Sequence, residues 1–82
     1  MEIICPIHAK ERMEQRNITQ KQIEKAIKDP DVRMPTRHKQ RKRIMKKFSP
    51  KTLDVIYEPR GKDKIVLITA MWLREEDREV KG

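Results

Sequence analysis

A histidine and an arginine near the start of the chain have the types and the spacing that suit proton transfer beside a phosphate. His8 and Arg12 are four residues apart, so they would share one face of a helix. An imidazole accepts and donates protons near neutral pH, and a guanidinium binds phosphate oxygens. Arg16, one turn later, extends the row. A structural role is equally open, because His8 can bond to nearby backbone and the arginines can pair with Glu11 or Glu14.

The excess positive charge of the chain is concentrated in one segment. The 82 residues carry a formal net charge of +8. Residues 33–51 contain nine lysines and arginines and no acid, whereas the rest of the chain has twelve bases and thirteen acids. Surfaces usually mix both signs, so this segment predicts a surface that binds a polyanion; a solvated run of charges is the alternative. His38 lies within the segment and is expected to be a contact residue rather than a catalyst. The cations expected to bind phosphates are Arg16, Arg37, Lys39, Arg41, Arg43, Lys46 and Lys47.

Composition limits the class of protein. Only 35% of the residues are hydrophobic and 41% are charged, so one small domain over residues 1–82 with a modest core is expected. Pairing with a second copy, as a homodimer, or with a protein partner would help so small a core. The lone Cys5 predicts no disulfide, and no metal or cofactor site is expected. Because no apolar run has membrane-spanning length, we expect a cytoplasmic protein with no membrane partner.

Two helices are expected in the first part of the chain. The first covers residues 8–16, which are good helix formers. Thr19 and Gln22 have the spacing of a capping box, so the second helix should begin at Thr19 and end before Pro30. Its buried face is expected to consist of Ile23, Ala26 and Ile27.

Strands are expected at the start of the chain and after Pro30. Residues 1–4 are short and apolar enough for an edge strand. The later candidates are residues 32–36, 41–48, 52–58 and 65–72. In segment 52–58, Leu53, Val55 and Tyr57 should lie on one face of the strand, with the residues between them on the other. This order predicts an α+β domain, in which two N-terminal helices pack on one face of a three- to four-stranded antiparallel sheet. The other face should carry the basic residues of segment 41–48. Residues 74–81 are expected to be a short helix or a frayed end.

Tyr57 and Thr69 fall on two strands expected to be adjacent. If both side chains face the same way as His8, the Tyr57 hydroxyl could contact the substrate and Thr69 could orient a phosphate. If they face the core, they are ordinary strand residues. Only three aromatic residues are present, so binding of a nucleic acid would depend on its phosphates and would weaken steeply with salt.

Two stretches of the chain carry a family resemblance. The first contains His8-Ala9-x-x-Arg12-Met13, Arg16-x-Ile18, Ile23, Ile27 and Asp29-Pro30. The second contains Asp54-Val55-Ile56-Tyr57 and Ile65-Val66-Leu67-Ile68-Thr69-Ala70. Together they resemble a widespread uncharacterised family of small prokaryotic proteins, which looks related to the RelE and BrnT toxins.

The resemblance implies a RelE/BrnT-like fold and a metal-independent endoribonuclease encoded beside an antitoxin. It implies two partners, RNA (including ribosome-associated mRNA) and an acidic antitoxin protein. Cleavage without metal needs a base, a cation that stabilises the phosphorane and an acid. The residues expected to supply these roles are His8, Arg12, Tyr57 and Thr69. The alternative is a non-catalytic module of the same fold that binds nucleic acid or only the antitoxin.

Overall fold

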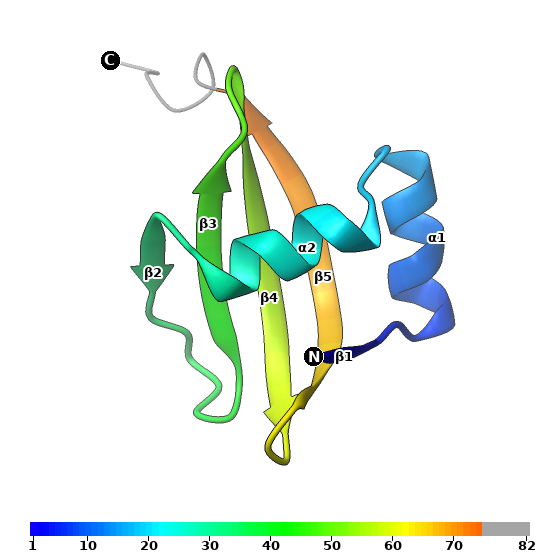
Figure 1. The fold of residues 1–82 in the computed structure, drawn as a ribbon, viewed down its shortest axis with the longest axis vertical. Helices are drawn as coiled ribbons and strands as arrows, with labels where there is room; N and C mark the ends of the chain where they lie inside the picture. Colours follow the sequence, from blue (N-terminus) through cyan, green and yellow to red (C-terminus); the bar gives the residue numbers. More distant parts are fainter. Residues whose placement is uncertain (75–82) are drawn as a thin grey trace.

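The computed structural model describes residues 1–74, which form one mixed sheet of five strands with two helices on one face (Figure 1). The α+β class is therefore confirmed. Apart from Arg74, the last residue of the sheet, the tail expected over residues 74–81 lies outside the described residues. None of the helices in residues 1–74 has both the length and the apolar character needed to cross a membrane.

The sheet differs from the expected one in strand number and direction. Its strands are β1 (Glu2–Ile4), β2 (Val32–Met34), β3 (Lys42–Lys47), β4 (Lys51–Arg60) and β5 (Lys64–Arg74), in the order β1-β5-β4-β3-β2. The four later strands are antiparallel neighbours, as expected. The edge strand β1 is a fifth member, and it runs parallel to β5. The prediction of a purely antiparallel sheet of three or four strands was therefore wrong, because a three-residue segment contains no signal for its direction.

Both expected helices are present, and their first residues lie within one residue of the expected positions. Helix α1 covers Ile7–Gln15 and α2 covers Gln20–Lys28. The capping box is present: the Gln22 amide donates to Thr19 Oγ1 over 3.1 Å, and the Thr19 amide donates to Gln22 Oε1 over 2.9 Å. Between the helices, Asn17 has φ of 56°, a left-handed conformation that asparagine tolerates. The chain thus turns sharply from α1 into α2.

The core lies between the helices and one face of the sheet. Helix α1 packs on β5, and α2 packs across β3 and β4. The expected alternation in β4 is confirmed, since Leu53, Val55 and Tyr57 are buried on the helix side. Ile23 and Ala26 are fully buried beneath α2, and Ile27 is partly buried. The helices therefore occupy one face and leave the other without a covering layer in the part of the chain that the structure describes.

The Thr19→Ala substitution should lower the free energy of unfolding by about 1 kcal/mol, because it removes the hydroxyl that caps α2. Urea denaturation measures the change. Gln20→Ala is the matched control: Gln20 is exposed at the first position of α2, so its effect should stay within about 0.5 kcal/mol. Equal effects of the two substitutions would contradict the capping role.

Candidate nucleic-acid interface

The loop that joins β2 to β3 borders a concavity of about 290 Å³ at the β2 end of the sheet. Within residues 1–74, no carboxylate lines this concavity. Its titratable lining residues are Arg33, His38, Lys39, Arg41, Lys42 and Arg43. Two strands and one loop contribute to it, so most of the basic segment converges on one place.

The loop has a defined shape because Thr36 bonds across it. The Thr36 hydroxyl lies 2.6 Å from the His38 carbonyl oxygen and 3.0 Å from that of Arg41, within donor distance of both. The Arg41 amide also donates to the His38 carbonyl oxygen over 3.0 Å. Pairing of β2 with β3 sets Arg33 opposite Ile44. The cations are therefore held by backbone pairing and by a side-chain bond within the loop.

Three of the nine bases are neutralised by carboxylates from outside the segment. Arg43 binds Asp54 through two bonds, Nε to Oδ1 at 3.0 Å and Nη2 to Oδ2 at 2.7 Å. The hydrogen bond to Asp54 raises the pKa of Arg43, so its guanidinium remains charged. Lys46 is buried; its Nζ lies 3.3 Å from Asp29 Oδ2 and also donates to the Asp29 carbonyl oxygen over 2.9 Å. Arg41 Nε lies 3.8 Å from Glu58 Oε1.

Four other bases are exposed and form no ion pair with a carboxylate in residues 1–74. We call them the β2–β3 cation cluster: Arg33, Arg37, Lys39 and Lys42. Lys51 instead lies over the Trp72 ring, 5.4 Å from its centroid. The backbone amide of Lys47 donates to Asp31 Oδ2 over 2.7 Å. The positive charge of the β2–β3 cation cluster therefore sits at the β2 end of the sheet, rather than over the whole face opposite the helices.

Arg16 lies away from this cluster and ties α1 to β5. Its Nη1 donates to the Ala70 carbonyl oxygen over 2.7 Å, and its own carbonyl oxygen accepts from Trp72 Nε1 over 2.8 Å. These two bonds join segments that are more than fifty residues apart in the chain. The geometry gives Arg16 a structural role, the alternative that the sequence left open.

His8 and Arg12 are exposed on α1 and are not brought to the cluster. Helix α1 packs on β5, and Figure 1 shows it near the β1 edge of the sheet, whereas β2 forms the other edge. Three strand intervals separate β5 from β2, which amounts to about 14 Å. The His8 ring and the concavity therefore do not form one site in this structure.

Tyr57 and Thr69 face opposite sides of the sheet. Tyr57 is buried on the helix side, directly across from Lys42 on β3. Burial raises the pKa of its hydroxyl, and the nearby charge of Arg33 opposes that rise. The hydroxyl therefore stays protonated at neutral pH and can donate a hydrogen bond. Thr69 pairs with Ile56, so it points to the helix-free face. Of the four expected catalytic residues, only Tyr57 lies near the cation cluster.

The prediction from the sequence included neither Arg33 nor Lys42 among the phosphate-binding residues. Alternation along β3 puts Lys42 on the same side as Ile44 and Lys46, which are buried. Lys42 is nevertheless exposed, whereas those two residues lie in the stretch on which α2 packs. Strand periodicity alone does not show which residues of β3 lie beneath α2, so it could not predict that Lys42 is exposed. No group of three or more His, Cys, Asp or Glu side chains in residues 1–74 is arranged to hold a metal ion.

Comparison with known proteins gives a family without an assigned activity. A family model described as a domain of unknown function, DUF4258, matches residues 7–72. The chain belongs to the DUF4258 family. No curated protein and no solved structure matches it significantly. The match agrees with the expected membership of an uncharacterised family of small proteins, while the relationship to RelE and BrnT stays a prediction.

The Arg16→Ala substitution should lower the free energy of unfolding by about 1–2 kcal/mol, because it leaves the Ala70 carbonyl without its charged donor. The control is Arg12→Ala on the same helix, an exposed position that should change stability by less than about 0.5 kcal/mol. Urea denaturation compares them. A stability loss confined to Arg12→Ala would overturn the assignment of Arg16 as the residue that holds α1 on β5.

Proposed function

We propose that this DUF4258 domain is a cytoplasmic RNA-binding module that binds the phosphates of RNA through the β2–β3 cation cluster. The observation that carries the proposal is that Arg33, Lys39 and Lys42, three cations without a carboxylate partner in residues 1–74, line one concavity, with Arg37 in the adjoining loop. Each would release counterions on meeting a phosphate, which is the main source of sequence-independent affinity. The cations are spread over two strands and a loop, which suits successive phosphates of a chain better than one compact anion.

The kind of nucleic acid follows from the family resemblance. The motif likeness to RelE and BrnT toxins favours RNA, with ribosome-associated mRNA as the substrate class, and a gene neighbour that encodes an acidic antitoxin. Two helices on one face of a small sheet are compatible with such a fold. With three aromatic residues in the whole chain, stacking contributes little, so sequence preference should be weak.

Two lysines on β3 provide a matched test of binding. Lys42→Met should weaken binding of a single-stranded RNA of about 12 nucleotides by about three- to tenfold and reduce the salt slope by about 0.7. Lys46→Met, four residues along the same face, should change affinity less than twofold, because Lys46 is already bound to Asp29. Fluorescence anisotropy between roughly 50 and 200 mM salt measures both quantities. Equal losses from the two variants would contradict the proposed site.

A second candidate function is metal-independent RNA cleavage, favoured by the position of His38. This imidazole lines the same concavity as Arg33 and Lys42, and Tyr57 lies across from Lys42. His38 would then serve as the base or acid, and the cations beside it would stabilise the developing phosphorane charge. The Tyr57 hydroxyl would be a nearby hydrogen-bond donor. His8, the histidine that the sequence favoured, lacks such neighbours on α1.

Alanine variants distinguish catalysis by His38 in the concavity from catalysis by His8 and Arg12 on α1, because the two assignments predict opposite effects on the cleavage rate. If the concavity cleaves RNA, His38→Ala should reduce the cleavage rate by at least about a hundredfold, whereas His8→Ala should leave it unchanged. A labelled RNA incubated at low salt with EDTA gives the rates on a sequencing gel. Loss of cleavage only in His8→Ala and Arg12→Ala would place the chemistry on α1 instead. Intact RNA after incubation with the folded wild-type chain would reject cleavage and leave the binding function to be judged by anisotropy.

A further inference from the structure

The sheet face opposite the helices presents a row of side chains that is apolar except for Asp54, which is buried and paired with Arg43. The register sets Val32 opposite Met45, Met45 opposite Asp54, and Asp54 opposite Met71, so one line of side chains crosses four strands. Val32 is 43% exposed and Met71 is 38% exposed. Met34, on the same face, is 37% exposed. Exposed apolar side chains gathered in this way mark an interaction surface more often than scattered ones do.

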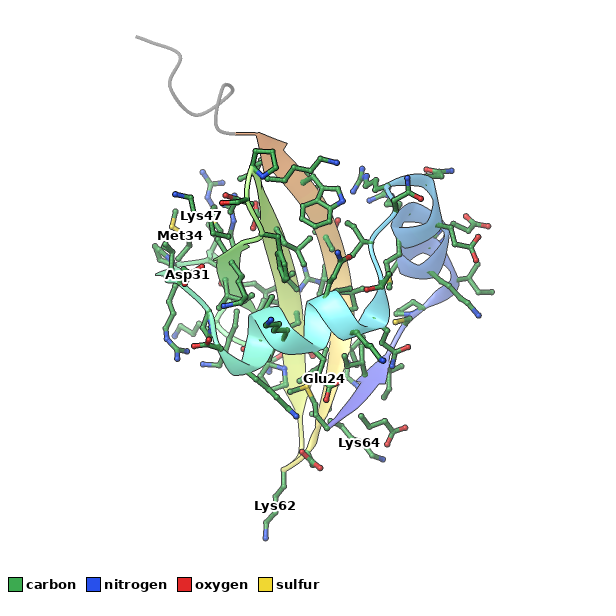
Figure 2. All side chains as sticks on the ribbon, turned by 45° about the horizontal axis from the view of Figure 1, so that its top comes forward. Glu24, Asp31, Met34, Lys47, Lys62 and Lys64 are labelled. Carbon is green, nitrogen blue, oxygen red and sulfur yellow. The ribbon has the colours of Figure 1, made fainter. Side chains whose placement is uncertain are left out.

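A small pocket lies at the β2 end of this row. It has a volume of about 160 Å³ and is lined by Asp31, Val32, Met45, Lys47 and Thr52. Figure 2 shows Asp31, Met34 and Lys47 at the β2 edge of the sheet. Thr52 is only 3% exposed, and its hydroxyl oxygen has no hydrogen-bond partner in the part of the chain that the structure describes. A buried hydroxyl without a partner is costly, so a native structure that keeps one needs a reason for it.

We propose that this face docks an acidic protein partner, which places an apolar side chain in the pocket and a main-chain group against the Thr52 hydroxyl. The pocket is smaller than the range of about 300–1,000 Å³ typical of small-molecule sites, so a single side chain fits it better. Met34, Met45 and Met71 are flexible and polarizable, which suits a surface that adapts to a partner.

Electrostatics selects the partner. A second copy of the chain would carry its own net charge of +8, and repulsion between the two like-charged chains opposes self-association. An acidic partner is attracted instead, because the face continues into the cation-lined concavity at Met34 and Arg43, which line that concavity as well. Charge complementarity of this kind steers association and rejects basic partners.

Docking here would also regulate the proposed RNA site. A partner that covers Met34 and Arg43 lies over the rim of the concavity, so RNA and partner should exclude each other. Only this competition rests on the proposed function; the docking surface itself does not. A domain that fails to bind RNA would therefore leave the docking result intact, and the reverse also holds.

Methyl NMR of the full chain with labelled methionines tests the docking surface. The probes are three synthetic peptides of equal length: alternating Leu and Glu, alternating Ser and Glu, and alternating Leu and Lys. The Leu–Glu peptide should shift the methyl signals of Met34, Met45 and Met71. The signal of Met13 should stay in place, because Met13 is buried beneath α1. The other two peptides should bind at least about tenfold more weakly.

Two substitutions distinguish specific binding at the docking surface from nonspecific binding to exposed apolar side chains, and a third tests the role of Thr52. Met71→Gln should weaken the Leu–Glu peptide at least about fivefold, whereas Ile7→Gln, at a 73% exposed position on α1, should not change its affinity. Thr52→Val should raise the thermal midpoint of the free chain and weaken the peptide, a combination that a purely structural threonine would not produce.

Four results would overturn the proposal. The Leu–Glu peptide could leave all three methionines unshifted, or the Ser–Glu peptide could bind equally well. Shifts of these methyl signals with protein concentration alone would assign the face to a second copy. A spin label at Gly82→Cys, in a Cys5→Ser background, that broadens Met45 and Met71 in the free chain would assign the face to the chain's own C-terminal residues.

Discussion

Four of the six residues of β3 are basic, and the strand is held between β4 and β2, where like charges on one face repel each other. The Arg43–Asp54 ion pair makes this arrangement stable. Both hydrogen bonds of the pair are charge-assisted, and Asp54 is 4% exposed on the neighbouring strand. On the other face, Lys46 reaches the C-terminal end of α2, where the carbonyl dipoles favour a cation. These two contacts offset the repulsion among the basic residues of this interior strand.

The same two contacts decide which charges remain for a ligand. Carboxylates come to β3 from β4 and from the end of α2, but none in residues 1–74 pairs with the exposed cations of the β2–β3 cluster. Thr36 fixes the course of the loop while its hydroxyl reaches only backbone carbonyls. The loop is therefore ordered without being neutralised. This difference turns a segment of nine bases into a localised cluster of four.

The sequence predicted what depends on neighbours in the chain. The capping box of α2 needs only Thr19 and Gln22, and the alternation of Leu53, Val55 and Tyr57 needs only strand period, so both predictions were confirmed. The parallel direction of β1 depends on where a three-residue segment meets β5, which no local pattern gives. The α+β class was predictable because it follows from element order, whereas strand count was not.

The candidate site was predicted less well, because its residues are sorted by distant partners. Arg16 was predicted from the sequence to bind phosphate, but in the structure its side chain donates to the carbonyl oxygen of Ala70, 54 positions away. Lys46 looks like part of a basic surface until α2 is placed over it. His8 and Tyr57 seemed able to share a face, but the order of the strands sets α1 and the concavity at opposite sides. Charge counting found the segment that holds the excess positive charge, and only packing identified which of its cations have no carboxylate partner in residues 1–74.

We propose that a polyanion binds this DUF4258 domain at the β2–β3 loop. A titration of the isotope-labelled chain with single-stranded RNA, followed through backbone amide signals at low salt, tests it residue by residue. We expect the largest shifts between Arg33 and Lys42, with the His38 amide among them and with α1 (Ile7–Gln15) nearly unchanged. Shifts that centre on α1 around His8 and Arg12, with the loop unaffected, would contradict it.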